Sequence, residues 1–306
     1  MKKLLALLLA LMMVLSLGAC GSKDTQAPAA DDSTAETGNT GDTAESTDTA
    51  AGDDAAAGET GDAAASDLQY IKDKGTLVVG MTNFAPMDYK EEGSDEWIGF
   101  DADMAKKFAE SLGVEVQFQE ITWDYKIMEL DNKSIDCVWN GMTLTDDVTS
   151  AMSTSEPYCL NAQVLVTKAD KAADFEDLTS REGYTVAVES GSAGEAAAQA
   201  LGAATVPVQA QSNALMEVAA GTSDAAVIDL LMAGAMVGEG TSYADLTYSL
   251  NLNEAQGLES EEYGVGFRKG SDVTEAFNTF WAEQVSNGTV LEVATTYGLQ
   301  ESVILE

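Results

Sequence analysis

Residues 139–158 read WNGMTLTDDVTSAMSTSEPY, and this stretch decides the fold. It continues the apolar run 135–138, which predicts a strand, and the small residue Gly141 favours a turn at the end of that strand. Thr145, followed by two aspartates, is typical of a helix N-cap. A strand that leads through a turn into a capped helix is the arrangement that places ligands at the carboxyl end of an open α/β sheet. The stretch therefore predicts an α/β protein.

Apolar runs alternate with amphipathic runs on both sides of this stretch. The runs that predict strands lie at 76–80, 114–118, 135–138, 184–188, 203–208, 224–228 and 263–267. Most of the intervals between them hold helical runs, such as 101–112, in which apolar residues recur every three or four positions. Repeated β-α-β order predicts a mainly parallel sheet flanked by helices, and the order restarts after residue 166.

The Asn-Gly turn, the Thr-x-Thr helix start and the Ser-x-x-Tyr run into Tyr158 together resemble a ligand-gripping segment. They are similar to the polar amino-acid-binding family, family 3, of bacterial solute-binding lipoproteins of ABC importers. The resemblance extends over nearly all of 68–306 and implies the two-lobed, type II periplasmic-binding-protein fold. It implies a first lobe at 68–158 plus 260–306, a second lobe at 163–256, and two hinge crossings between them.

The resemblance also implies how such a protein works. A monomer captures a small polar solute, either an amino acid or an amino-acid-like amine, by hinge closure of its lobes. The closed form then delivers the solute to the ABC permease subunits in the membrane, and no cofactor is expected. Two other functions remain open, because function does not follow from fold. One is an enzyme of the cyclic-acid dehydratase type, with Glu189 as its acid, and the other is a ligand sensor without transport.

The resemblance implies nine ligand-binding residues, which lie in five segments. Two of the residues are aromatic and are expected to pack against the ligand, one after the first strand and one at the start of a helix. Others are a glycine turn, a helix N-terminus and an aspartate that accepts the ammonium group of the ligand. Each has a structural alternative, such as a packed aromatic residue, a plain turn or a helix cap. The nine are Phe84, Trp123, Asn140, Gly141, Thr143, Gly191, Ser192, Ala193 and Asp229.

One position of the ligand-gripping segment departs from the family. The arginine that holds the α-carboxylate of the ligand in the family corresponds to Val148, ten residues before Tyr158. Valine cannot form the bidentate contact that a guanidinium makes with a carboxylate. The folded region contains two arginines, Arg181 and Arg268, and neither replaces the lost one by its position. Either the carboxylate rests on backbone N–H groups and Thr143, or the ligand has no α-carboxylate.

The N-terminal region predicts secretion and a lipid anchor. Two lysines precede the apolar run 4–17, which is too short for a transmembrane helix of about 20 residues. The run ends in Leu-Gly-Ala-Cys, which predicts a lipoprotein signal peptide at 1–20 with lipid attachment at Cys20. Residues 21–67 contain no aromatic or large aliphatic residue and predict a disordered acidic tether. The expected location is the outer face of the cell membrane.

Composition excludes several classes of site. The chain contains no histidine, which excludes Ser-His-Asp triads, Cys-His nucleophiles and histidine-ligated metal sites, so no metal is expected. The formal net charge of −37 argues against a nucleic-acid partner, whose phosphates require clustered Lys and Arg. Cys137 and Cys159 could pair in an oxidising compartment, but two separate buried thiols are favoured.

Overall fold

The structure is a computed structural model that describes residues 66–175, 183–255 and 260–306. The predicted signal peptide, Cys20, nearly all of the predicted tether and Arg181 lie outside the described residues. The first helix, α1 (Asp67–Lys74), begins at a residue that was assigned to the tether, and Ser66 caps it by accepting the N–H of Gln69. Of the helices that the structure describes, none has the length and hydropathy needed to cross a membrane.

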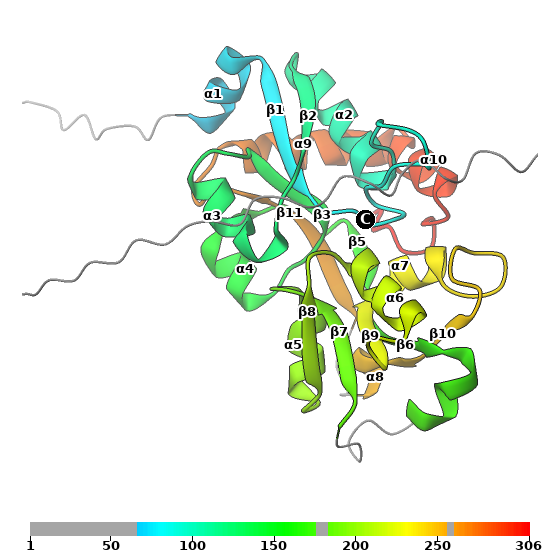
Figure 1. Ribbon diagram of the computed structural model, residues 1–306. Coiled ribbons are helices and arrows are strands. Elements are labelled where there is room, and N and C mark those ends of the chain that lie inside the picture. Colours follow the sequence, from blue (N-terminus) through cyan, green and yellow to red (C-terminus); the bar gives the residue numbers. More distant parts are fainter. Residues whose placement is uncertain (1–65, 176–182, 256–259) are drawn as a thin grey trace, which may run out of the picture. The chain divides into compact units, whose positions relative to one another are not determined.

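The first sheet has the order β2-β1-β3-β11-β4, and β5 also pairs with β11 (Figure 1). Its strands are β1 (Thr76–Met81), β2 (Glu115–Glu120), β3 (Cys137–Thr143), β4 (Ser153–Thr154), β5 (Cys159–Asn161) and β11 (Glu261–Phe267). The pairs β1–β2 and β1–β3 are parallel, whereas β11 runs antiparallel to all of its neighbours. The C-terminal strand therefore completes the sheet that the N-terminal strands begin.

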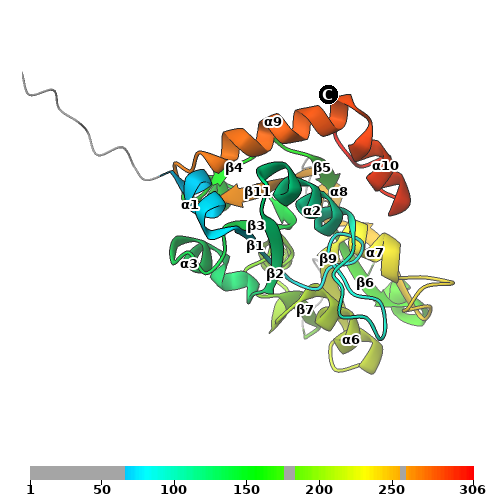
Figure 2. The ribbon, with the colours of Figure 1, turned by 90° about the horizontal axis from the view of Figure 1, so that it is seen from above.

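Helices cover both faces of the first sheet, because its strands bury alternate residues on opposite sides. Val79 and Trp139 pack in the same apolar core as α2 (Phe100–Leu112), α9 (Val273–Ser286) and α10 (Thr289–Thr296). Figure 2 shows α9 lying along this side of the sheet beside β11. Val78 and Val138 point the other way, into a cluster with α3 (Lys126–Asp131) and α4 (Asp146–Ala151).

The second sheet has the order β10-β6-β9-β7-β8. Its strands are β6 (Gln163–Lys168), β7 (Thr185–Glu189), β8 (Ala204–Val208), β9 (Ala225–Asp229) and β10 (Leu246–Asn251). The residues of α6 (Gln211–Ala220) and α7 (Leu230–Met236) pack on one face, and α5 (Ala193–Ala200) and α8 (Leu252–Ala255) pack on the other. The short helix η2 (Ala169–Phe175) follows β6 and adds Phe175 to the second of these faces.

The two sheets are joined by two connections, from β5 to β6 and from β10 to β11. The strands next to these connections make antiparallel pairs, whereas β7, β8 and β9 pair in parallel as β-α-β order predicts. This is the expected α/β class with two sheets and flanking helices.

Two questions left by the sequence concern the pairing of Cys137 with Cys159 and the place of Arg268. Cys137 and Cys159 are both buried, and both are free thiols in the described region. Arg268 is also buried, and its Nε lies 2.8 Å from Oδ2 of Asp67. Its guanidinium donates to the carbonyl of Ile135 as well, 2.8 Å away, and lies 3.5 Å from Asp136. Arg268 therefore ties α1 to the first sheet.

Candidate functional site

The predicted ligand-binding residues follow the carboxyl ends of strands in both sheets. Phe84 comes shortly after β1, and Trp123 comes after β2 in the short helix η1 (Trp123–Tyr125). The segment Asn140–Thr143 forms the end of β3. In the second sheet, Gly191 follows β7 and Asp229 ends β9. These ends are where ligands bind in open α/β sheets.

Asp229 lies at the centre of a buried cluster of amides. It is 4% exposed, and its Oδ1 accepts hydrogen bonds from Gln163 Nε2, 2.6 Å away, and from Asn161 Nδ2. Its Oδ2 accepts from Gln211 Nε2. Burial raises the pKa of Asp229 to about 7, and the nearby charge of Glu261 adds to this effect, while the amide hydrogen bonds oppose it. The amides therefore fix both carboxyl oxygens in place.

The alternative role of Asp229 as a helix cap is wrong for its side chain. Its backbone is in the N-cap position of α7, but its side chain makes no capping hydrogen bond with the described helix. Both carboxyl oxygens point instead toward the amides around them. The role of Asp229 in binding a ligand stays a prediction.

Glu261 extends the cluster into the first sheet. Its Oε2 accepts from Gln163 Nε2 at 2.8 Å and from Asn161 Nδ2 at 3.2 Å. It also accepts from the hydroxyl of Thr143, 3.2 Å away. The predicted residue Thr143 therefore contacts the cluster from the β3 side, and the side chain of Gln163 bridges acids that belong to different sheets.

Glu189 is a second buried acid at the edge of this cluster. It is 3% exposed, and burial raises its pKa to about 8, with a contribution from the charge of Asp229 that a hydrogen bond with Thr82 opposes. Its Oε1 is buried without a hydrogen-bond partner among the residues that the structure describes. The carboxyl is therefore neutral near pH 7 and has unused hydrogen-bonding capacity.

Phe84 and Gly141 pack against each other below the site. Phe84 is 1% exposed and meets the ring of Tyr263 edge-on, with the ring centres 6.4 Å apart. Gly141 has a φ of +53°, and a Cβ there would lie 2.6 Å from Cε1 of Phe84. The N–H of Gly141 donates to Asp101 Oδ2 at 2.7 Å. The packed-aromatic alternative therefore describes Phe84 in this structure.

Asn140 is also committed to internal contacts. It is 3% exposed, and its Oδ1 accepts from the backbone N–H of Thr82 at 3.0 Å. Its Nδ2 donates to the carbonyl of Thr82 and to Asp88 Oδ2, the latter at 2.8 Å. The side chain therefore holds the turn after β1 against the end of β3.

Trp123 lies beside a buried cation. The indole and Val148 belong to the same apolar cluster, and they are 7% and 5% exposed. The Nζ of Lys126 lies 4.9 Å from the centre of the Trp123 ring and donates to the carbonyl of Gly191, 3.0 Å away. Burial lowers the pKa of Lys126, whereas the charges of nearby acids, Glu189 foremost, oppose this. Lys126 thus connects the segments that follow β2 and β7.

The turn between β7 and α5 is closed by a capping box. The hydroxyl of Ser192 accepts from the N–H of Glu195 at 3.1 Å, and the Glu195 carboxylate accepts from the N–H of Gly191 at 2.8 Å. The N–H of Ser192 donates to the carbonyl of Glu189. Ala193 is the first residue of the helix. Two of the three N–H groups that were expected to face a ligand are thus bound within the turn.

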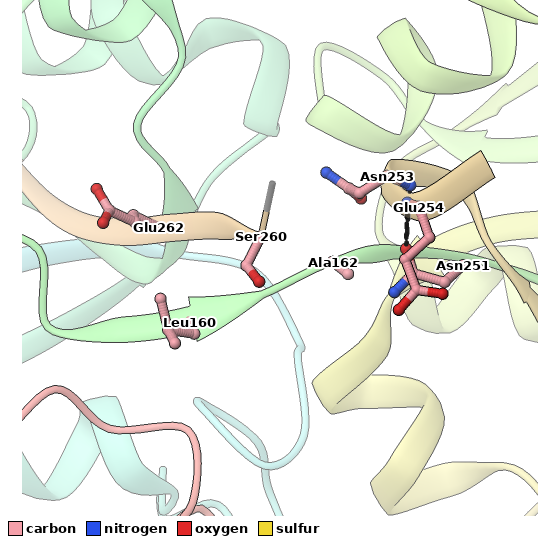
Figure 3. A pocket seen from close by; sticks show the side chains of 7 residues that line it. All are labelled: Leu160, Ala162, Asn251, Asn253, Glu254, Ser260 and Glu262. Carbon is pink, nitrogen blue, oxygen red and sulfur yellow. Dashed lines mark hydrogen bonds between the residues drawn. The ribbon is translucent and has the colours of Figure 1, made fainter. Parts of the chain in front are cut away.

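A cavity of about 470 Å³ lies beside the two connections, and none of the nine predicted residues lines it (Figure 3). Strand alternation explains its position. Asn161 and Gln163 point to the cluster around Asp229. Leu160 and Ala162, which alternate with them along the chain, point to the opposite side and line the cavity. In the same way Glu261 faces the cluster, whereas its neighbour Glu262 lines the cavity. The cavity and the cluster are therefore on opposite faces of the same strands.

Sequence reasoning missed several residues of the site. These are Lys126, Asn161, Gln163, Gln211 and Glu261. One signal was present, because polar residues at alternate positions 161 and 163 in an apolar strand region mark a shared polar face. The other residues come from distant segments, and only the fold brings them to Asp229.

Comparison with known proteins gives consistent matches. The model of the family described as bacterial extracellular solute-binding proteins, family 3, matches residues 77–300. The arginine-binding extracellular protein ArtP of Bacillus subtilis is 30% identical over 227 residues, which are 70% of this chain and 83% of ArtP. The ABC transporter glutamine-binding protein GlnH of Bacillus subtilis is 27% identical over 300 residues, 96% of each chain.

Solved structures agree with these relatives. One is the ancestral amino acid-binding protein AncCDT-1, which is described as a precursor of cyclohexadienyl dehydratase. It is 29% identical with a TM-score of 0.67, and the match covers 76% of this chain and 99% of that one.

Proposed function

Because the chain belongs to the bacterial extracellular solute-binding proteins of family 3, we propose that it holds the ammonium group of its solute at Asp229. Proteins of this kind are the substrate-binding components of ABC transporters for amino acids and similar small polar solutes. The solute is an amino acid or an amine, and we favour one with a net positive charge.

The observation that carries this proposal is the environment of Asp229. Amide groups of Gln163, Asn161 and Gln211 orient both of its oxygens, and Oδ2, which accepts one of these hydrogen bonds, can accept a further one. An ion pair with an ammonium is stronger in such a buried place than at the surface. The nearby charge of Glu261 also favours a cation. The names of the arginine-binding and glutamine-binding relatives support an amino acid.

A binding experiment tests this function. Purified protein is titrated by calorimetry with the common amino acids and with simple amines. Asp229→Asn should weaken the best solute by roughly 30-fold or more, because losing one partner of a buried charge pair costs about 2–5 kcal/mol. Asp131→Asn, at an exposed carboxylate on α3, is the matched control and should bind as the wild type does. Equal affinity in the Asp229→Asn variant would refute the proposal.

We propose that the lobes expected from the sequence move about the two connections and that closure presents the solute to the permease. A lipid on Cys20 and the acidic tether at 21–67 would keep the receptor beside the permease, as a monomer on the outer face of the membrane.

An enzymatic function is the second candidate, and Glu189 is the observation that favours it. A buried carboxyl with a pKa of about 8 is protonated at neutral pH and could act as a general acid. The likeness to a precursor of a cyclohexadienyl dehydratase points the same way. Proton NMR of the titration mixtures distinguishes the two functions, because a receptor returns its solute unchanged and an enzyme consumes it.

A further inference from the structure

An amino acid carries a carboxylate as well as an ammonium group, and a buried carboxylate is stabilised by a cationic partner or by several hydrogen-bond donors. The residue at the position of the family's arginine cannot supply one. Val148 is 5% exposed, and its side chain packs in the apolar cluster that contains Trp123. A positive charge for this carboxylate can therefore come only from another element.

Two cationic side chains are buried in the region that the structure describes, Arg268 and Lys126. Arg268 is engaged by Asp67 and by the carbonyls of Leu130 and Ile135, on the side of the first sheet where α1 begins. Lys126 is the buried cation that lies among the predicted site segments. We infer that Lys126 takes over the role of the missing arginine and binds the carboxylate of the solute, an inference that rests on the proposed function.

The geometry around Lys126 supports this role. Its Nζ donates to the carbonyl of Gly191 at 3.0 Å and to that of Trp123 at 3.3 Å. An ammonium has three N–H groups, so one remains for a further acceptor. Within residues 66–175, 183–255 and 260–306, Lys126 forms no ion pair with a carboxylate. It is therefore a buried charge whose protein partners are neutral carbonyls.

The acid with the largest electrostatic effect on Lys126 is mostly protonated at pH 7. Among the acids that act on Lys126, Glu189 has the largest effect. Burial raises the pKa of Glu189 to about 8, so this carboxyl is mostly protonated at pH 7. The charge of Lys126 then remains available to an anion that reaches it. The protein would hold the two ends of an amino acid with Asp229, at the end of β9, and Lys126, in the helix α3 that packs on the first sheet.

The test compares amino acids with the amines that lack only the carboxylate. The pairs are L-arginine with agmatine, L-lysine with cadaverine, and L-histidine with histamine. Calorimetry on the full protein measures each Kd for the wild type and for Lys126→Met. The variant should weaken the bound amino acid about tenfold or more and change the Kd of its amine less than about twofold, because one charge-assisted contact is lost.

Further variants separate charge from structure. Lys126→Gln keeps N–H groups that can reach the Gly191 carbonyl but removes the charge, and it should behave as Lys126→Met does. Lys126→Arg should retain most of the preference for the amino acid. Lys107→Met, at an exposed lysine of α2, should leave every Kd unchanged. Thermal unfolding of each variant verifies that it is folded.

Two results would overturn the inference alone. If the neutral variants weaken amino acid and amine equally, Lys126 only connects the two segments that it contacts. If they still prefer the amino acid as the wild type does, another group binds the carboxylate. Failure of the wild type to bind any amino acid or amine would instead overturn the proposed function, and the role of Lys126 with it.

Discussion

At the scale of single residues, protonation sets the charge of Asp229 and Glu189. The pKa values of Asp229 and Glu189 are about 7 and about 8, whereas unfolded Asp and Glu titrate near 4. Both shifts arise mainly because burial disfavours the charged form. Between about pH 4 and pH 8 the folded protein therefore binds more protons than the unfolded chain does.

This difference predicts opposite effects of pH on stability and on affinity. The free energy of unfolding should fall as pH rises from 5 to 8, because the unfolded chain binds fewer protons in that range. Affinity for an ammonium-bearing solute should rise over the same interval as Asp229 ionises. Urea unfolding and calorimetry at pH 5, 6, 7 and 8 measure the two trends. A double variant, Asp229→Asn with Glu189→Gln, should weaken both trends, although Asp101, whose pKa burial also raises to about 7, still contributes to the trend in stability. A wild-type stability that rises with pH would contradict the prediction.

At the scale of elements, Gly141 lies inside β3, because the strand continues to Thr143 where the sequence predicted a turn at Gly141. Gly141 combines a left-handed φ of +53° with close contact to the rings of Phe84 and Tyr263. Gly113 at the end of α2 also has a positive φ, of +75°, but nothing lies within 4 Å of the place of its missing Cβ. The two glycines therefore separate the cost of backbone conformation from the cost of steric overlap.

Alanine at each position should measure those costs by urea unfolding. Gly113→Ala should lower the free energy of unfolding by about 1 kcal/mol, the usual cost of a left-handed residue. Gly141→Ala should lower it by about 3 kcal/mol or more, since the aromatic rings must also move. Equal losses in the two variants would mean that the rings near Gly141 adjust freely.

At the scale of the whole molecule, apolar periodicity predicted most of the strands, because each element buries one face, but it did not predict β4, β5 or β10. The return of β11 to the first sheet was implied by the family resemblance and not by periodicity. The hydrogen-bond partners of individual side chains were harder to predict. Asn140 and Thr143 are polar residues on one strand, yet one holds an internal turn and the other contacts Glu261. Their partners lie on distant segments, so the local sequence does not reveal which of them faces a ligand.

Attachment to the membrane is also a property of the whole chain. If Cys20 carries the lipid, Cys20→Ala should release the protein from the membrane fraction into the medium, because its acyl chains are the proposed anchor. Fractionation followed by immunoblotting measures this. The Cys137→Ala variant, at a buried free thiol, is the control and should stay with the membrane. Retention of Cys20→Ala at wild-type levels would contradict the anchor.

Gln163 has a consequence for anyone who wishes to redesign this receptor. Its side-chain nitrogen serves Asp229 of one sheet and Glu261 of the other, at 2.6 and 2.8 Å. In the proposed function, a substitution of Gln163 chosen to change ligand selectivity would therefore also weaken the contact between the two sheets. Because one amide contacts both acids, variants of Gln163 must be assayed both for ligand selectivity and for the contact between the two sheets.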